Sequence, residues 1–317
     1  MIYLLLISIF VSLILTPFFK KVGEKYGFCD LVSEDPLKIH QKAISYLGGL
    51  AILLTAIVLF FVGMVFEKSF NWQIFGIITG GIIVFLIGFW DDFKWKKERI
   101  KPAKKFLFLI LFSILTAIVL LVIDIKIQFF PVLWLSFPLT FFYILGAINA
   151  INFEDGIDGL AGGLVGISLI GFIILAIILG QSLALVISLV LLGAILGFLI
   201  FNFPPAKIFM GDSGAYFLGF ILIVLASIFS KPFDVISIAA PILIIGLPVF
   251  DTGLTILRRI LQRKSPFFGD RAHFFDRIIQ RGFSTRKTVL FSYFLQLILV
   301  VLGVTIYLNL SLNIKLF

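Results

Sequence analysis

Residues 160–201 read LAGGLVGISLIGFIILAIILGQSLALVISLVLLGAILGFLIF, and this stretch decides the fold. It contains no charged residue and is about twice as long as the ~20 residues that an α-helix needs to cross a bilayer. Its clearest break is Gly180-Gln181-Ser182, where the chain can turn back on itself. The pattern therefore predicts two membrane-spanning helices that form a tight hairpin.

The rest of the chain is apolar to the same degree. Hydrophobic residues make up 61% of it, charged residues only 14%, and the mean hydropathy is +1.18. Soluble domains usually carry about 25% charged residues, so a soluble protein is excluded. We predict an all-α integral membrane protein, one polytopic domain over 1–317 with about ten transmembrane helices: 1–19, 44–66, 72–90, 106–123, 129–151, 160–180, 182–201, 214–230, 235–257 and 289–308.

The distribution of basic residues supports this count. Of the 26 Lys and Arg, 22 lie in alternate loops: 20–43, 91–105, 152–159, 202–213 and 258–288. Because short cytoplasmic loops carry the Lys and Arg excess, these loops are predicted to be cytoplasmic and both termini to lie outside. Without the hairpin, the strongly basic loop 258–288 would fall on the outer side.

Three further features limit the possibilities. The first span has no basic residue before it, and Lys20 and Lys21 follow it, so a cleavable signal peptide is not expected. Cys29 is the only cysteine, which excludes intramolecular disulfides and indicates a reduced thiol. The net charge of +9 lies on one membrane face, where it orients the protein and attracts anionic lipid. No nucleic-acid partner is expected.

Most of the acids share the face of the cations: 14 of the 17 Asp and Glu lie in or beside the same loops. Asp91 and Asp92 follow one another at the end of span 72–90. Adjacent carboxylates repel unless a metal or a proton relieves them, and neighbours on a helix point about 100° apart. Separate tasks are therefore expected for the two, with the cations of 94–105 as a rim for a lipid phosphate. The alternative is a solvated pair that caps the next helix.

Two more loops carry acids. Loop 152–159 has three acids and no cation, and a helical turn would place Asp155 and Asp158 on one side. The alternative is that an acid here simply stabilises the positive N-terminal end of span 160–180, but this explains only one of the three acids. Two prolines make loop 202–213 irregular before Asp212, which is either a metal ligand or an N-cap.

The residues near the last cytoplasmic loop, and the glycines of span 44–66, indicate a function less specifically. Asp251 is an ionisable residue inside the apolar span 235–257, which by default indicates a function. It lies near the cytoplasmic end, however, where a pair with Arg258 or Arg259 is the alternative, and Pro248 should kink the helix there. Within the basic loop 258–288, Arg271 and His273 are candidates for phosphate binding. Gly48 and Gly49 permit close approach of either a ligand or a neighbouring helix.

Together these residues predict an intramembrane enzyme with a cytoplasmic, Asp-rich site. Mg²⁺ suits carboxylates combined with substrate phosphates, with Mn²⁺ as the alternative metal. A site at the membrane surface lets one substrate be a lipid and the other water-soluble.

The sequence resembles the polyprenyl-phosphate N-acetylhexosamine-1-phosphate transferases in the order of its motifs over essentially the whole chain. The resemblance is closest to the bacterial undecaprenyl-phosphate GlcNAc-1-phosphate transferases, and the phospho-MurNAc-pentapeptide translocases are the sister branch. The motifs are Asp91-Asp92, Asn149-Ala150-Ile151-Asn152, Asp155-Gly156-Ile157-Asp158-Gly159, Phe209-Met210-Gly211-Asp212-Ser213-Gly214 and Pro248-Val249-Phe250-Asp251.

The resemblance implies a reaction at the cytoplasmic face of the bacterial inner membrane. A UDP-sugar and undecaprenyl phosphate would give undecaprenyl-pyrophosphoryl-sugar and UMP, and a homodimer is left open. Asp91 would act on the lipid phosphate, as a base or as a covalent nucleophile, and Asp92 would assist either Asp91 or the metal. Asp212 would bind the metal. Asn152 and Asp155 would contact the nucleotide-sugar and Asp158 the uracil, with Phe209 stacked on the base and Asn202 nearby. Arg271 and His273 would also bind substrate.

Two departures bear on the sugar. The GlcNAc branch has His-x-His-His where this chain has His273-Phe274-Phe275-Asp276, and segment 45–49 lacks the Thr-Pro-Thr-Met-Gly-Gly pattern of the pentapeptide branch. The pentapeptide translocase is therefore the second hypothesis. A transporter of an anionic substrate is the third, but transporters place ionisable groups near the bilayer midplane, and here they gather at one face.

Overall fold

The computed structural model describes residues 1–30, 43–66, 71–95, 102–263 and 273–313. The described chain is almost entirely helical. Its elements are α1 (Ile2–Tyr26), β1 (Cys29–Asp30), β2 (Ile44–Ser45), α2 (Gly48–Phe66), α3 (Trp72–Trp90), the π-helix η1 (Asp91–Trp95), α5 (Pro102–Val122), α6 (Leu133–Glu154), α7 (Leu160–Ile178), α8 (Ser182–Asn202), α9 (Gly211–Phe229), α10 (Ile236–Ile245), α11 (Leu247–Leu261), α12 (Phe274–Gln280) and α13 (Thr285–Asn313).

The predicted membrane architecture is confirmed. Within the described residues, 9 helices are long and apolar enough to cross a bilayer, and α10 with α11 forms a bent pair that would bring the number to 10. The hairpin at Gly180 is present, with a left-handed φ of 67° between α7 and α8. The two short strands β1 and β2 pair antiparallel beside the end of α1.

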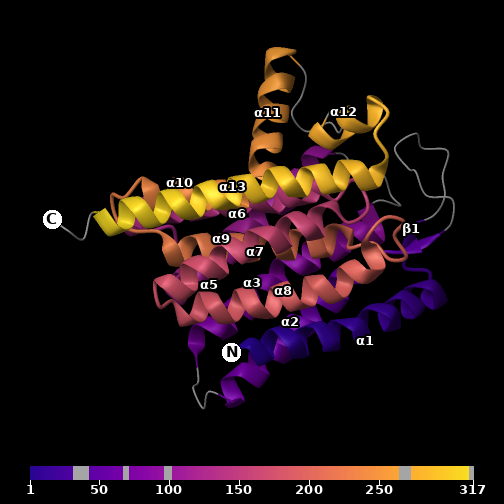
Figure 1. The fold of residues 1–317 in the computed structure, drawn as a ribbon, viewed down its shortest axis with the longest axis horizontal. Helices are drawn as coiled ribbons and strands as arrows, with labels where there is room; N and C mark the ends of the chain where they lie inside the picture. The colour runs from indigo at the N-terminus through magenta and orange to yellow at the C-terminus, as the bar shows by residue number, and fades with distance from the viewer. Residues whose placement is uncertain (31–42, 67–70, 96–101, 264–272, 314–317) are drawn as a thin grey trace.

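Helix α9 forms the centre of the bundle (Figure 1). It packs against α3 and α6 and also contacts α2, α7, α8 and α10. As a result, 89% of the residues in its apolar membrane-spanning stretch are buried. Helix α8 lies between α1 and α7, and α13 packs against α10 and α7. Since α9 contacts so many helices, the residues at its start are held from several sides.

The span expected at 235–257 is not one continuous helix. It breaks at Gly246, where α10 and α11 meet at 91°, and α11 projects from the side of the bundle (Figure 1). The break does not occur at Pro248, which lies in the first turn of α11. The buried Gln296 of α13 satisfies the backbone there: its Nε2 donates to the carbonyls of Ile244 and Ile245, and its Oε1 accepts from Leu247 N.

Some helices extend beyond the predicted limits. Helix α1 continues to Tyr26 and ends at Gly27, whose φ of 76° is the left-handed conformation typical of a helix C-terminus. Helix α6 continues to Glu154, so the first three residues of the predicted loop 152–159 are helical. The candidate site residue Asn152 is therefore held by a helix.

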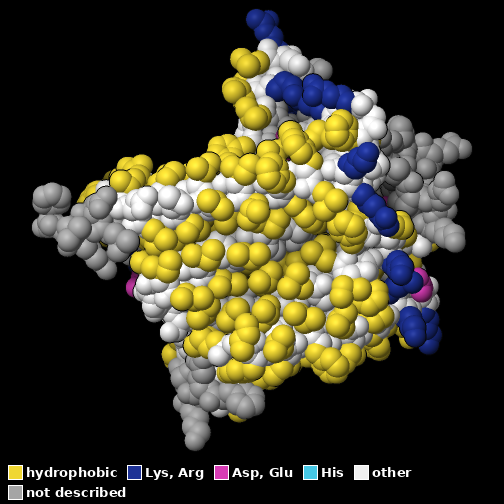
Figure 2. All heavy atoms as spheres, viewed as in Figure 1, with side chains coloured by type: hydrophobic (Ala, Val, Ile, Leu, Met, Phe, Trp, Pro, Cys, Tyr) yellow, Lys and Arg dark blue, Asp and Glu magenta, His cyan; other side chains and the backbone are white. Residues whose placement is uncertain are grey.

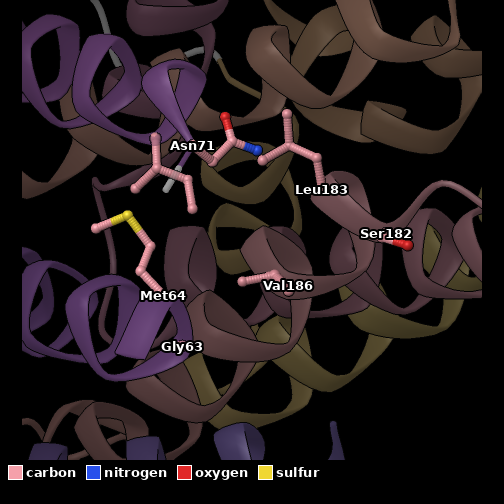
Figure 3. Close-up of a pocket in the computed structure, with 7 residues that line it drawn as sticks. Gly63, Met64, Asn71, Ser182, Leu183 and Val186 are labelled. Atoms are coloured by element: carbon pink, nitrogen blue, oxygen red, sulfur yellow. The ribbon is translucent and has the colours of Figure 1, made fainter. Parts of the chain in front are cut away.

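The two ends of the bundle differ in charge. Figure 2 shows Lys and Arg side chains gathered at one end of this face, the end at which β1 and α12 lie in Figure 1. Helix α1 begins and α13 ends toward the opposite end. That opposite end also contains a small pocket between α2, α3 and α8, lined by residues such as Met64, Asn71 and Leu183 (Figure 3). The side of the membrane on which each end lies remains a prediction.

Candidate active site

The start of α9 is fixed by Asp92. Its Oδ1 accepts from Asp212 N at 3.0 Å, and its Oδ2 accepts from Ser213 N at 3.1 Å. Helix α3 approaches so closely that a Cβ on Gly88 would lie 2.5 Å from Ser213 Cα. Asp92 thus does cap a helix, but that helix is α9, more than a hundred residues away in sequence. Its negative charge also suits the positive end of the helix dipole.

Asp91 points to different partners. Lys105 Nζ forms an ion pair with Asp91 Oδ2 and lies 3.5 Å from Asp212 Oδ2. The hydroxyl of Tyr216 donates to Asp91 Oδ2 at 3.5 Å. The two adjacent carboxylates therefore have separate partners, as the helical geometry predicts.

Asn152 completes the group. Its Nδ2 donates to Asp212 Oδ1 at 2.9 Å from the last turn of α6. Asp91, Lys105, Asn152 and Asp212 are hereafter the acidic cluster. They come from η1, α5, α6 and α9, so the folded bundle, not any one loop, assembles them.

The donor atoms of the acidic cluster can be compared with those that Mg²⁺ prefers. Among the described residues, no three His, Cys, Asp or Glu are grouped to hold a metal. Asp91 and Asp212 instead provide two carboxylates on either side of Lys105. Mg²⁺ is often held by one or two carboxylates together with substrate phosphates and water, and this donor set fits that mode.

Two predicted nucleotide contacts connect loops in the structure. Asn202 Oδ1 accepts from Gly159 N at 3.0 Å, and its Nδ2 donates to Ile208 O at 2.8 Å. Asp158 Oδ2 accepts from Ala206 N at 2.8 Å. These side chains join loop 155–159 to loop 203–208, and Asp155 and Asp158 do not share a helical turn as proposed, because α6 ends at Glu154. Their contact with a base remains a prediction.

Helix α13 braces the same two loops. Arg286 Nε donates to Pro204 O at 2.7 Å, and the Tyr293 hydroxyl donates to Gly159 O at 2.5 Å.

The glycines at the start of α2 serve helix packing. Gly48 N donates to Phe209 O at 3.0 Å, Gly49 N donates to Met210 O at 2.9 Å, and a Cβ on Gly49 would lie 2.4 Å from Gly214 N. Of the two explanations left open, the close approach of a helix is the one observed. Phe209, which is partly exposed, is held by backbone hydrogen bonds to Gly48 and Ser45.

A second polar group lies where α11 meets α12. Asp251 Oδ2 lies 2.7 Å from His273 Nδ1, and its Oδ1 accepts from Phe274 N at 2.8 Å. The alternative pairing of Asp251 with Arg258 or Arg259 is therefore wrong, since both oxygens already face the start of α12. The His273 ring lies 5.3 Å from the ring of Phe153, the residue next to Asn152. Arg271 lies outside the described residues.

Sequence reasoning missed two charged residues. Lys105 was one of seven cations in 94–105, and no local spacing distinguished it. Glu154 is 2% exposed, its Oε1 has no hydrogen-bond partner, and the charges of Asp251 and Asp276 act on it. Its only signal was its place in a loop without cations.

Comparison with known proteins identifies the family. The chain is 35% identical over 298 residues to a probable undecaprenyl-phosphate N-acetylglucosaminyl 1-phosphate transferase of Bacillus subtilis, which covers 91% of this chain and 80% of that protein. It is 30% identical over 286 residues to the undecaprenyl-phosphate alpha-N-acetylglucosaminyl 1-phosphate transferase of Thermotoga maritima, covering 90% of this chain and 82% of that protein. The chain belongs to the polyprenyl-phosphate N-acetylhexosamine-1-phosphate transferase superfamily.

The match extends to the sister branch. A phospho-N-acetylmuramoyl-pentapeptide-transferase of Limosilactobacillus fermentum is 33% identical over 209 residues, 63% of each chain. The model of glycosyl transferase family 4 matches residues 74–230. That region of this transferase contains the whole acidic cluster, whereas the Asp251–His273 pair lies beyond it.

Proposed function

We propose that this enzyme transfers GlcNAc-1-phosphate from UDP-GlcNAc to undecaprenyl phosphate. The products are undecaprenyl-pyrophosphoryl-GlcNAc and UMP, and the reaction takes place at the cytoplasmic face of the bacterial inner membrane. The observation that carries the proposal is the acidic cluster, assembled from four elements at the charged end of the bundle. Two relatives that align over most of the chain are named as undecaprenyl-phosphate N-acetylglucosaminyl 1-phosphate transferases.

The bond changes in this reaction are simple. An oxygen of the lipid phosphate forms a bond to the β-phosphorus of UDP-GlcNAc. The bond between that phosphorus and the bridging oxygen breaks, and the oxygen leaves with UMP. Three phosphate groups must therefore come together, so neutralisation of their charge is the main task of the site.

The residues of the acidic cluster have separate roles in this proposal. Lys105 bridges Asp91 and Asp212 and would move onto an incoming phosphate. Asp91 would act on the lipid phosphate, while Asn152 holds the orientation of Asp212 through its amide. Mg²⁺ held by Asp212, with Asp91 beside it, would supply charge neutralisation for the pyrophosphate.

Nucleotide release from the full-length enzyme tests the proposal. With undecaprenyl phosphate, UDP-GlcNAc and Mg²⁺, the enzyme should release UMP, and chelation of the metal should stop the release. Asp91→Asn and Asp212→Asn should each lower the rate at least ~100-fold. Asp234→Asn is the matched control, because Asp234 caps α10 toward the opposite end of the bundle, and it should keep the wild-type rate.

Three results would contradict the proposal. Release of UDP in place of UMP would indicate sugar transfer without the phosphate. Turnover of UDP-MurNAc-pentapeptide but not of UDP-GlcNAc would assign the chain to the sister branch. Full activity of Asp91→Asn or Asp212→Asn would remove that residue from its role. Label from a β-³²P donor on the protein, without acceptor, would distinguish a covalent Asp91 intermediate from direct attack.

A further inference from the structure

The contact between Asp251 and His273 determines which nitrogen of the imidazole carries a proton. Asp251 Oδ1 accepts the backbone N–H of Phe274 at 2.8 Å, and both oxygens of an ionised carboxylate can only accept. Its Oδ2 lies 2.7 Å from His273 Nδ1. Nδ1 must therefore donate, and Nε2 is left as the other nitrogen. Among the described residues, Nε2 has no hydrogen-bond partner.

The surroundings leave the imidazole little freedom to turn. The side chains of His273 and Asp251 are 8% and 7% exposed. The ring of Phe275 stacks on the imidazole with 7° between the planes, and Phe153 lies against it at 5.3 Å between ring centroids. A rotation that moved Nδ1 away from Asp251 would therefore lose a buried hydrogen bond and an aromatic contact.

The pair is connected to the acidic cluster by the chain itself. Phe153, which contacts the imidazole, follows Asn152, whose amide donates to Asp212. Both lie in the last turns of α6. The position of His273 relative to the acidic cluster is thus set by one rigid helix and by Asp251.

We infer that Asp251 is a positioning residue: it holds His273 in the Nδ1–H tautomer and leaves Nε2 available to the donor substrate. This inference rests on the proposed function. A carboxylate that orients an imidazole in this way is a common arrangement in enzymes, and its loss changes the tautomer more than the fold.

The neighbouring acids allow an experiment to distinguish a positioning role of Asp251 from a purely structural role. Asp251 and Asp276 both interact electrostatically with the buried Glu154, and Asp276 Oδ2 accepts from His273 N at 3.3 Å. In Asp251→Asn, the amide oxygen can still accept from Phe274 N, while the repulsion from Glu154 is relieved. The variant should therefore unfold no earlier than the wild type and yet lose activity.

The tautomer can be measured directly, because the chain has only two histidines, His40 and His273. In protein labelled with ¹⁵N-histidine, the signals that disappear in His273→Gln belong to His273. The wild type should show Nδ1 protonated at a pH where the ring is neutral, and Asp251→Asn should shift the population to Nε2–H. The same tautomer in both proteins would overturn the inference, whatever reaction the enzyme catalyses.

Kinetics show whether the tautomer matters for turnover. Asp251→Asn should lower kcat/KM for the donor roughly 10- to 100-fold and leave the KM for the lipid acceptor unchanged. In the His273→Gln background, Asp251→Asn should cause no further loss, since it acts through His273. Independent, multiplying losses would overturn the inference. Asp234→Asn is again the control. If the wild type did not turn over these substrates, the proposed function would be contradicted, whereas the inferred tautomer would still be tested by the nitrogen signals.

A second variant tests the same role with Asp251 intact. His273→Asn keeps a donor near the position of Nδ1 but has no atom at the position of Nε2. Both His273→Asn and His273→Gln remove the ring that packs on Phe153 and Phe275, so the two variants should unfold at similar temperatures. His273→Asn should lose at least as much donor turnover as His273→Gln. Wild-type turnover by His273→Asn would show that Nε2 has no part in the reaction.

Discussion

Glu154 is a buried carboxylate in unfavourable surroundings. It is 2% exposed and its Oε1 has no partner. Burial, and then the nearby charges of Asp251 and Asp276, disfavour its ionised form. It also ends α6, where the helix dipole disfavours negative charge. An unpaired buried polar group costs about 1–3 kcal/mol, and no described contact offsets this cost.

Glu154→Gln should therefore stabilise the protein. The amide keeps the shape of the side chain and cannot carry a negative charge, so we expect the thermal unfolding midpoint in detergent to rise. Glu24→Gln is the matched control: Glu24 is exposed and only 3.6 Å from Lys20 in a surface pair, which contributes little. A lower midpoint for Glu154→Gln would mean that the carboxylate has a stabilising partner.

For individual residues, the sequence predicts some contacts and not others. The divergence of Asp91 and Asp92 follows from helical geometry alone, and it is observed. The bond between Asn152 and Asp212 joins residues 60 positions apart, and nothing local indicates it. Lys105 could not be distinguished from its basic neighbours, because the packing of α5 against α3, not its local sequence, brings it to Asp91.

Among the elements, the break between α10 and α11 is the largest difference from the predicted helices. Hydropathy shows one apolar run over 235–257, and Pro248 predicts a kink in it. The break depends in addition on Gln296, which lies in another helix and satisfies the freed backbone groups. A local pattern cannot show such a partner. The break matters for the site, since it directs α11 outward and places Asp251 against α12.

A side chain at Gly246 should disturb this break. Gly246 has φ 62° and ψ −115°, and a Cβ there would lie 2.8 Å from Gln296 Oε1 and from Leu243 O. Strained backbone of this kind costs about 1–3 kcal/mol, so Gly246→Ala should lower the unfolding midpoint and the transfer rate. The rate should fall because Asp251 would lose its position.

Gly253 provides the control for this prediction. It lies within α11, and a Cβ there would meet nothing within 4 Å. Gly253→Ala should leave the midpoint unchanged or raise it by up to ~1 kcal/mol through helix propensity. Equal effects of the two substitutions would show that the conformation at Gly246 is not required.

For the whole molecule, apolar runs and charge were sufficient to predict the architecture. The predicted span 72–90 coincides with α3, and the hairpin at Gly180 lies where the count of basic loops required it. These features depend only on the length of apolar runs and on the position of Lys and Arg, both of which are local. Which helices surround α9 depends on the fit of many side chains, and neither apolar run length nor the position of Lys and Arg can predict that.

The single cysteine gives a direct test of which end of the molecule is cytoplasmic. Cys29 lies in β1 at the charged end, partly buried, and its Sγ donates to Gly23 O at 3.5 Å. Burial, and then the charge of Glu24, raise the pKa of its thiol. Because the thiolate is the reactive form, labelling should be slow near neutral pH and become faster as the pH rises.

A membrane-impermeant maleimide should therefore label Cys29 in inside-out vesicles and not in intact spheroplasts, with a larger yield at pH 8.5 than at pH 7. The matched control is Cys29→Ser with Gln181→Cys, because Gln181 is exposed at the turn between α7 and α8. That turn is predicted to face outward, so this variant should label in spheroplasts without opening them. Labelling of Cys29 from outside, with Gln181→Cys protected, would invert the orientation and place the acidic cluster away from a cytoplasmic nucleotide-sugar.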